Sequence, residues 1–205
     1  IMTEEVKRGT TTVGIVAKDG IVLAADSLST IGHMRANESS TKIYKINDNI
    51  ALTIAGGVGD ALILVRFLQN QANLYELEHK RPMSPKSCVT LLSNVLNSSR
   101  MVPFYTQFIL GGYSNNTFFL YNLDMVGGIT EETKFTFTGS GSELVASILD
   151  KSYKPNILVK DAIELAKDAI SFAKKRDIFS GGDGIKVVVI DKNGVQELPL
   201  QKFDK

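Results

Sequence analysis

The sequence predicts an α+β fold in which antiparallel sheets are covered by pairs of helices. The first observation is the order of the expected elements, which runs strands, two helices, strands, two helices, strands. A repeated parallel crossover would alternate single strands with single helices, so adjacent helix pairs favour antiparallel sheets. The second observation is size. With 205 residues, 43% of them hydrophobic, the chain suffices for one sizeable core and is short for two domains.

The chain begins with a group of strands. Residues 10–17 are small and β-branched, and the pair Asp19-Gly20 is favoured in tight hairpin turns before the apolar run at 21–25. Further on, residues 42–46 alternate as a half-buried strand does, and residues 50–55 form the next apolar run. The first group of strands therefore ends near residue 55.

Two helices are expected after the break at Gly56-Gly57. From about Val58 onwards, apolar residues recur at spacings of three and four and predict one buried face. The expected buried residues are Leu62, Val65, Leu68, Ala72 and Tyr75. Ser84 is the expected N-cap of the second helix, with Pro85 at its first position.

The second half of the chain repeats this order. Apolar or β-branched runs predict strands at 107–113, 117–122 and 134–138. A helix is expected after residues 139–142, and another has one apolar face. That face comprises Val159, Ala162, Ile163, Ala166, Ile170 and Ala173. Strands at 185–190 and 195–198 close the chain.

Composition excludes several classes of function. The 23 Lys and Arg residues nearly balance the 22 Asp and Glu residues, so no long-range attraction to nucleic acid or an anionic membrane is expected. Cys88 is the only cysteine, which excludes an internal disulfide and suits a reducing compartment. No apolar run approaches the roughly 20 residues that cross a bilayer, and residues 1–9 lack the apolar stretch of a secretory signal. We therefore expect a soluble, cytoplasmic protein.

The common catalytic motifs are absent from the sequence. His33 lies in a polar loop without a nucleophile elbow, and His79 lies in a charged segment. No His, Cys and carboxylate spacing suits zinc, and residues 56–59 lack the lysine of a phosphate-binding loop. Cys88 falls within an amphipathic helical pattern, where a buried thiol is more usual than a nucleophile. We expect no metal and no cofactor.

A set of short motifs remains, spread over the chain from residue 9 onwards. They are Gly9-Thr10-Thr11-Thr12, Ala24-Ala25-Asp26, Thr41-Lys42-Ile43, Ala55-Gly56-Gly57-Val58-Gly59-Asp60, Thr138-Gly139-Ser140-Gly141-Ser142 and Arg176-Asp177-Ile178-Phe179-Ser180-Gly181-Gly182. In this order they resemble the β subunits of proteasomes, in particular archaeal ones. These subunits are threonine peptidases of the N-terminal-nucleophile class. The resemblance implies a four-layer αββα sandwich, with two stacked antiparallel sheets between helix pairs.

The resemblance also implies a chemistry. Cleavage after Gly9 would make Thr10 the first residue, and its free α-amine, with a pKa of about 7.7–8.0, would accept the proton of its own hydroxyl. Lys42 would favour the alkoxide-like form of that hydroxyl, and Asp26 would hold Lys42. The backbone N–H of Gly56 would stabilise the oxyanion of the tetrahedral intermediate.

Other residues take supporting roles by the same resemblance. Ser140, Asp177 and Ser180 match the polar network around the threonine amine. Thr30 matches a position whose backbone pairs with the peptide substrate. The substrate pocket would be formed by residues near Ser29, Tyr44, Ile54 and Val58. Without an acid or a base among them, this pocket favours cleavage after hydrophobic residues.

Each of these residues also has an ordinary structural interpretation. Taken alone, residues 10–12 could form an edge strand, Asp26 could cap a loop and Lys42 could face solvent. Residues 139–142 could simply begin a helix with Ser as its cap, and residues 177–182 could end one. The sequence also departs from the family after Asp26, where basic residues are frequent. This chain has Ser27-Leu28-Ser29-Thr30 there, which leaves the local support of the site open.

We expect residues 1–9 to be a leader and residues 10–205 to be one domain. Three interpretations of the leader remain open: a precursor before ring assembly, a subunit processed with the help of a sister subunit, or a catalytically silent subunit with a structural role. The full set of motifs favours the competent precursor.

The expected partners also follow from the resemblance. The chain would join a homo- or hetero-heptameric β ring stacked with α-subunit rings, degrade unfolded polypeptides and meet regulatory ATPase caps indirectly. An alternative is the simpler bacterial two-ring peptidase with the same threonine chemistry. The Gly9-Thr10 pair with its leader and residues 180–182 favour the proteasome form.

Overall fold

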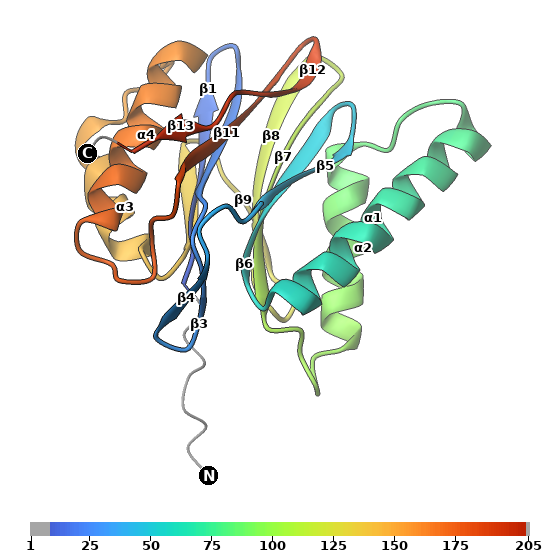
Figure 1. Cartoon of the computed structure of the whole chain (residues 1–205). Helices are drawn as coiled ribbons and strands as arrows, with labels where there is room; N and C mark the ends of the chain where they lie inside the picture. Colours follow the sequence, from blue (N-terminus) through green and yellow to red (C-terminus); the bar gives the residue numbers. More distant parts are fainter. Residues whose placement is uncertain (1–8, 204–205) are drawn as a thin grey trace.

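The computed structural model describes residues 9–203, which build four layers of secondary structure (Figure 1). Helices α3 (Ser142–Ser152) and α4 (Val159–Lys174) cover one side, and α1 (Val58–His79) and α2 (Pro85–Ser98) cover the other. Two antiparallel sheets lie between these helix pairs. The α+β class and the four-layer order expected from the sequence are therefore confirmed.

The first sheet carries the start of the described chain. Its order is β10-β1-β2-β11-β12, with β13 also paired to β11, and all of its pairs are antiparallel. The strands are β1 (Thr11–Ala17), β2 (Gly20–Asp26), β10 (Phe135–Gly139), β11 (Gly184–Asp191), β12 (Gly194–Glu197) and β13 (Gln201–Lys202). The Asp19-Gly20 turn joins β1 to β2 as a hairpin, with Ala17 paired to Gly20.

The second sheet has the order β5-β6-β7-β8-β9 and is also antiparallel. Its strands are β5 (Ile43–Asn47), β6 (Ile50–Gly56), β7 (Thr106–Ser114), β8 (Thr117–Leu123) and β9 (Ile129–Glu131). A separate small hairpin, β3 (Ser29–Ile31) and β4 (Met34–Asn37), leaves the end of β2. It projects below the first sheet in Figure 1.

Three buried apolar clusters hold the layers together. One, which includes Val13 and Leu149, lies between the first sheet and α3 and α4, and another, which includes Leu52 and Leu68, lies between the second sheet and α1 and α2. The third, which includes Leu23 and Ile109, lies between the two sheets. Each fully buried side chain of this size contributes about 1.5–3 kcal/mol. Apolar side chains therefore fill all three interfaces between the four layers.

Local signals explain the helix boundaries. The Ser84 hydroxyl accepts a hydrogen bond from the Ser87 N–H at 3.1 Å, and Pro85 opens α2, which confirms the expected cap. At α3 the alternative interpretation of residues 139–142, a helix start with Ser as its cap, is wrong. The N-cap is Gly141, and the Ser142 hydroxyl instead donates to the Gly139 carbonyl. A glycine is needed there because a neighbouring threonine side chain occupies the space of a Cβ.

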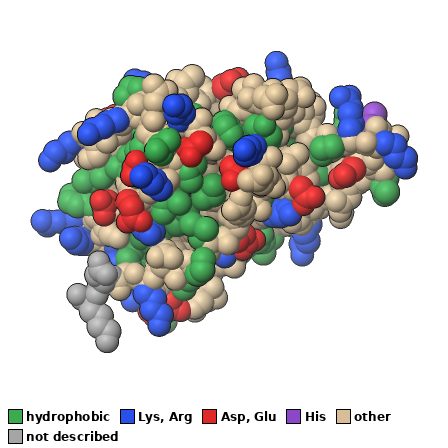
Figure 2. Space-filling model, turned by 90° about the horizontal axis from the view of Figure 1, so that it is seen from above, with side chains coloured by type: hydrophobic (Ala, Val, Ile, Leu, Met, Phe, Trp, Pro, Cys, Tyr) green, Lys and Arg blue, Asp and Glu red, His purple; other side chains and the backbone are tan. Residues whose placement is uncertain are grey.

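The surface is charged without a dominant sign. Figure 2 shows Lys and Arg side chains interspersed with Asp and Glu, and with apolar side chains between them. This mixture agrees with the formal net charge of +1. No helix within residues 9–203 is long and apolar enough to cross a membrane.

Candidate functional site

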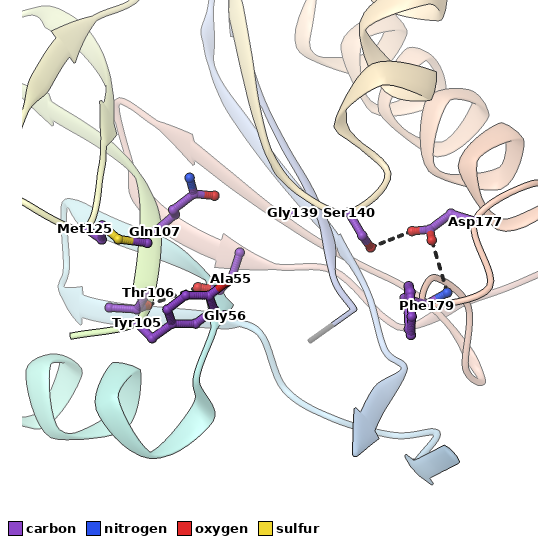
Figure 3. A pocket seen from close by; sticks show the side chains of 10 residues that line it. All are labelled: Ala55, Gly56, Tyr105, Thr106, Gln107, Met125, Gly139, Ser140, Asp177 and Phe179. Atoms are coloured by element: carbon purple, nitrogen blue, oxygen red, sulfur yellow. Dashed lines mark hydrogen bonds between the residues drawn. The ribbon is translucent and has the colours of Figure 1, made fainter. Parts of the chain in front are cut away.

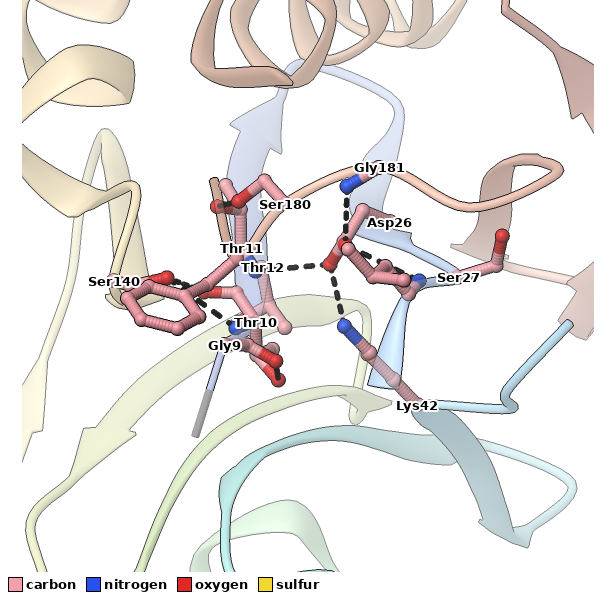
Figure 4. Close-up of polar contacts among 12 residues, drawn as sticks. Gly9, Thr10, Thr11, Thr12, Asp26, Ser27, Lys42, Ser140, Ser180 and Gly181 are labelled. Atoms are coloured by element: carbon pink, nitrogen blue, oxygen red, sulfur yellow. Dashed lines mark hydrogen bonds and ion pairs between the residues drawn. The ribbon is translucent and has the colours of Figure 1, made fainter. Parts of the chain in front are cut away.

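The candidate nucleophile lies where three chain segments from both sheets meet. Thr10 immediately precedes β1, Asp26 is the last residue of β2, and Lys42 immediately precedes β5. Because β1 and β2 are hairpin partners with Thr12 opposite Ala25, Asp26 reaches the start of β1. Thr10 retains only 5% of its accessible surface. The antiparallel pairing therefore assembles these side chains (Figure 4).

Asp26 and Lys42 form a buried ion pair. The Lys42 Nζ donates to the Asp26 Oδ1 at 2.7 Å, and the two side chains are 4% and 0% exposed. The solvent-facing interpretation of Lys42 is therefore wrong. Asp26 also accepts hydrogen bonds from the backbone N–H groups of Thr11, Leu28 and Gly181. Its carboxylate thus organises the start of β1, the chain after β2 and the loop after α4.

Burial dominates the electrostatics of this pair. It lowers the pKa of the Lys42 ammonium below its ordinary 10.5, and the Asp26 charge offsets part of that decrease. Burial likewise raises the pKa of the Asp26 carboxyl above 3.8, while Lys42 and the N–H groups of Thr11 and Gly181 oppose the increase. The Lys42 ammonium therefore gives up its proton at a lower pH than an exposed lysine does.

Thr10 contacts the peptide bond that precedes it. Its Oγ1 donates to the Gly9 carbonyl oxygen at 2.6 Å, and the Gly9 N–H donates to the Thr30 Oγ1 at 3.2 Å. The Thr10 N–H donates to the Ser140 Oγ at 3.4 Å. Within the described chain, no hydrogen bond joins Lys42 to the Thr10 hydroxyl. Both residues line the same pocket.

Asp177 joins the other two members of the polar network expected from the sequence, Ser140 and Ser180. Its Oδ2 accepts hydrogen bonds from the hydroxyls of Ser140 and Ser180, each at 2.6 Å. Ser140 follows β10 and Ser180 lies in the loop after α4. This loop passes beside the start of β1 and contributes Ser180 to the site. The interpretation of residues 177–182 as only the end of a helix is therefore wrong. The electric field of Asp177 also favours the charged form of Lys42.

Gly56 ends β6 immediately before α1. Its φ of +102° requires glycine, and a Cβ there would lie 2.4 Å from the Tyr105 carbonyl oxygen. That same oxygen accepts the Gly57 N–H at 2.6 Å. Gly56 lines two pockets, one of which also contains Thr10.

The first pocket, of about 320 Å³, contains Gly9, Thr10 and Lys42. All of the residues expected to bind substrate line it. They are Ser29, Thr30, Tyr44, Ile54 and Val58. Its remaining side chains include Asn37, Ser39 and Thr41, so its rim is polar while its interior wall is partly apolar.

The second pocket, of about 380 Å³, was not expected from the sequence (Figure 3). Ala55, Gly56, Ser140 and Asp177 line it together with a group of residues that were not singled out. These are Tyr105, Thr106, Gln107, Met125, Gly139 and Phe179. Phe179 and Gly139 lie inside the quoted motifs. Of the others, Tyr105 precedes β7, Thr106 and Gln107 begin it and Met125 follows β8, and no motif marks them.

This arrangement supports nucleophilic chemistry at a hydroxyl group. A threonine hydroxyl lies against a peptide carbonyl, a buried lysine with a lowered pKa lines the same pocket, and a carboxylate orders the surrounding hydroxyls. Among the described residues, no three His, Cys, Asp or Glu side chains converge as metal ligands would. These features, carried on a four-layer αββα sandwich, define the class of N-terminal-nucleophile hydrolases.

Comparison with known proteins gives the family. The family model described as "Proteasome subunit" matches residues 6–190. The chain is 50% identical to the "Proteasome subunit beta" of Methanococcus aeolicus over 194 residues, which cover 94% of this chain and 89% of that one. It is 45% identical to the "Proteasome subunit beta" of Methanocaldococcus jannaschii, with coverages of 98% and 90%. For the "Proteasome subunit beta 1" of Thermococcus onnurineus the identity is 45%, with coverages of 99% and 98%.

The chain therefore belongs to the proteasome subunit family. The resemblance inferred from the motifs is confirmed. Membership implies a protease and assembly into a multi-subunit particle.

Proposed function

We propose that this chain is a β subunit of a proteasome core and a threonine endopeptidase whose nucleophile is Thr10. Residues 1–9 are a leader, and residues 10–205 are the single mature domain. Residues 1–8 of this leader lie outside the described residues, and Gly9 is the first residue that the structure describes. The observation that carries the proposal is the 2.6 Å hydrogen bond from the Thr10 hydroxyl to the Gly9 carbonyl, at the peptide bond to be cut.

Self-cleavage of that bond frees the α-amine of Thr10. The amine then accepts the proton of the Thr10 hydroxyl as it attacks a substrate carbonyl. Ser140 is placed to hold the amine, since its Oγ already accepts the Thr10 N–H. An amide nitrogen cannot take up this proton, so the uncut chain is inactive toward other peptides.

The remaining site residues stabilise charge. Lys42 favours the alkoxide-like form of Thr10, and Asp26 fixes Lys42 through the 2.7 Å contact. Asp177 and Ser180 complete the network around Ser140. The Gly56 N–H stabilises the oxyanion. Its place in the lining of both pockets supports this role.

The pocket that contains Gly9 and Thr10 receives the substrate side chain that precedes the cut. Tyr44, Ile54 and Val58 supply apolar surface, and Lys42 is already paired with Asp26. Cleavage after hydrophobic residues therefore follows. The Thr30 hydroxyl accepts the Gly9 N–H, and this contact supports a place for Thr30 beside the peptide backbone of the substrate.

The particle is a heptameric β ring stacked with α-subunit rings that encloses unfolded polypeptides, with ATPase caps as indirect partners. We assign it to the cytoplasm. Support comes from Cys88, which is the only cysteine of the sequence and is a free thiol, as suits a reducing compartment.

The test is reconstitution of this chain with its α partner and any sister β subunit. Intact mass and N-terminal sequencing follow the leader, and a peptidase assay with a hydrophobic peptide runs alongside. We expect Thr10 to become N-terminal as activity appears. Thr10→Ala abolishes both changes, by at least about 10³-fold in activity, because the nucleophile is gone.

Thr10→Ser is the matched control, since it keeps a hydroxyl at the same position and should retain measurable activity. A leader that survives in assembled, active particles would contradict the proposal. It would make this chain a structural subunit and leave the cutting to another one.

A further inference from the structure

We infer that Thr11 is a positioning residue, whose hydroxyl and N–H hold the nucleophile strand between the Asp26–Lys42 pair and the Asp177 cluster. This inference rests on the proposed function of Thr10. Thr11 is the first residue of β1 and is fully buried. Its Oγ1 is hydrogen-bonded to the Ser180 Oγ (Figure 4).

The direction of that hydrogen bond follows from the partners of Ser180. The single hydroxyl proton of Ser180 is donated to the Asp177 carboxylate at 2.6 Å. A carboxylate accepts only, and a serine hydroxyl donates once, so the Ser180 Oγ must accept the proton of the Thr11 hydroxyl. Thr11 therefore reaches Asp177 through one intervening hydroxyl.

Ser140 forms a second hydrogen-bonded link from the Asp177 carboxylate to the start of the strand. It donates to the Asp177 Oδ2 at 2.6 Å, and its Oγ accepts the Thr10 N–H at 3.4 Å. Asp177 thus holds two consecutive residues, Thr10 through its nitrogen and Thr11 through its side chain. The link through Ser140 ends on the Thr10 nitrogen, which becomes the α-amine after cleavage, whereas the link through Ser180 ends on Thr11, the next residue.

Thr11 also contacts the second acidic group of the site. Its N–H donates to the Asp26 Oδ1 at 2.9 Å, the same oxygen that accepts the Lys42 Nζ at 2.7 Å. Thr11 is therefore hydrogen-bonded to Asp26, which holds Lys42. Through Ser180 it is also linked to Asp177, which holds the Thr10 nitrogen through Ser140. The position of Thr11 therefore fixes the distances of Thr10 from Asp26 and from Asp177.

The packing around the Thr11 hydroxyl leaves it little freedom. A Cβ at Gly141 would lie 2.1 Å from the Thr11 Oγ1 and 3.3 Å from the Ser180 Oγ. Only glycine at position 141 admits the Thr11–Ser180 contact. The glycine at the start of α3, which gives this helix no side-chain cap, is explained by that hydroxyl pair.

Thr12 provides a matched comparison one residue further along β1. It is also fully buried, and its hydroxyl is bonded to the Thr138 hydroxyl at 2.6 Å and accepts from Thr53 at 3.1 Å. The hydrogen-bond partners of its side chain are therefore threonines, and its hydroxyl makes no hydrogen bond to Asp26 or Asp177. Loss of its hydroxyl measures the general cost of removing a buried hydroxyl from this strand.

The experiment compares Thr11→Val, Thr11→Ser and Thr12→Val in the complex reconstituted with the α partner. Each variant is checked for assembly and thermal melting, and kcat is expressed per exposed Thr10 terminus. We expect Thr11→Val to lower kcat by about 10- to 100-fold through misplacement of the nucleophile. KM should stay within about twofold, because the substrate pocket is unchanged. Thr11→Ser should restore kcat to within about threefold, and Thr12→Val should stay within about twofold of the parent.

The outcomes separate the two hypotheses. An unprocessed, inactive parent complex would refute the proposed function itself. With an active parent, a Thr11→Val kcat near the parental value would overturn the inference. So would equal losses in Thr11→Val and Thr12→Val, or a Thr11→Ser variant as slow as Thr11→Val. If Thr11→Val does not assemble, the smaller Thr11→Ala replaces it under the same criteria.

Discussion

Among residues 9–203, the buried charged side chains are Asp26 and Lys42, and each depends on the other. Lys42→Met leaves the Asp26 carboxylate buried without its partner, so the free energy of unfolding should fall by about 3–5 kcal/mol. The double change Asp26→Asn with Lys42→Met removes both charges and should cost less than Lys42→Met alone. Urea unfolding of the isolated chain at a fixed concentration measures these values.

The control for this cycle is Lys45→Met, which breaks the exposed pair between Lys45 and Asp48. Its cost should stay below about 1 kcal/mol, because solvent screens exposed pairs. A Lys42→Met variant no less stable than Lys45→Met would mean that the buried pair contributes nothing.

The lowered pKa of Lys42 predicts the pH dependence of the mature enzyme. Activity needs a neutral Thr10 amine, so kcat/KM should rise with pH through about 7.7–8.0. It also needs a protonated Lys42, so kcat/KM should fall again at a pH below 10.5, because burial lowers the pKa of that ammonium. An activity profile still flat at pH 10.5, in complexes shown to be intact, would contradict the charged role of Lys42.

At the scale of elements, the loop after α4 determines what can stand before Thr10. A Cβ at Gly9 would lie 2.0 Å from the Phe179 Cβ and 2.3 Å from the Phe179 carbonyl oxygen. Gly9→Ala must therefore move the scissile bond, and its self-cleavage should slow by at least about 100-fold. Intact mass against time after mixing with the partners measures the rate.

The matched control is Gly59→Ala, where a Cβ would meet nothing within 4 Å. It lies in the first turn of α1, so alanine should leave processing unchanged and favour the helix slightly. If both variants process at the parental rate, the contact with Phe179 does not restrict position 9.

The helix α2 shows how local chemistry defines an element. Ser84→Ala removes the acceptor of the Ser87 N–H and should lower the free energy of unfolding by about 0.5–2 kcal/mol. Ser98→Ala, at the last position of α2 and exposed, is the control and should cost less than about 0.5 kcal/mol. Equal costs would mean that the cap is not what stabilises α2.

The hairpin β1–β2 is buried on both faces and could be predicted from its small and β-branched residues around the Asp19-Gly20 turn. The helices α2 and α4 could be predicted because each buries one face with a helical period. On α1 the expected burial is confirmed for Val65, Leu68 and Ala72 and is wrong for Leu62 and Tyr75, which are only partly buried. The short strands β3, β4, β9 and β13 were not predicted. Most of their residues are exposed, so no alternation of apolar and polar residues marks them. Their pairing follows from where the longer strands place them.

The site was predicted to different degrees. The polar residues were found because they lie in motifs of family order, and the structure brings Thr10, Ser140 and Asp177 into contact. The burial of Lys42 could not be predicted from the sequence. Lys42 lies immediately before β5, and the alternation of buried and exposed residues along a strand does not apply to a residue outside it. The second pocket was missed because Tyr105, Gln107 and Met125 meet it only through the packing of β7 and β8.

At the scale of the whole molecule, an exposed apolar patch adjoins the site. Ile31 and Met34, at the tip of the β3–β4 hairpin, are 76% and 75% exposed, and Ile178 in the loop after α4 is 70% exposed. His33 of the same hairpin lies against Phe179, with ring centroids 5.8 Å apart, so the hairpin tip and the loop form one surface. In a family that assembles into particles, such a surface is expected to be covered by a neighbouring subunit of the same ring.

The double change Ile31→Ser with Met34→Ser should therefore leave the isolated chain within about 0.5 kcal/mol of its parental stability, because both side chains are exposed. It should nevertheless reduce incorporation into the complex, since burying each side chain stabilises an interface by about 1.5–3 kcal/mol. Native mass spectrometry of mixtures with the α partner measures incorporation. Lys192→Ser, in the turn between β11 and β12, is the exposed control. Normal incorporation of the hairpin variant would mean that this patch faces the open chamber, where it would meet substrate chains instead of a subunit.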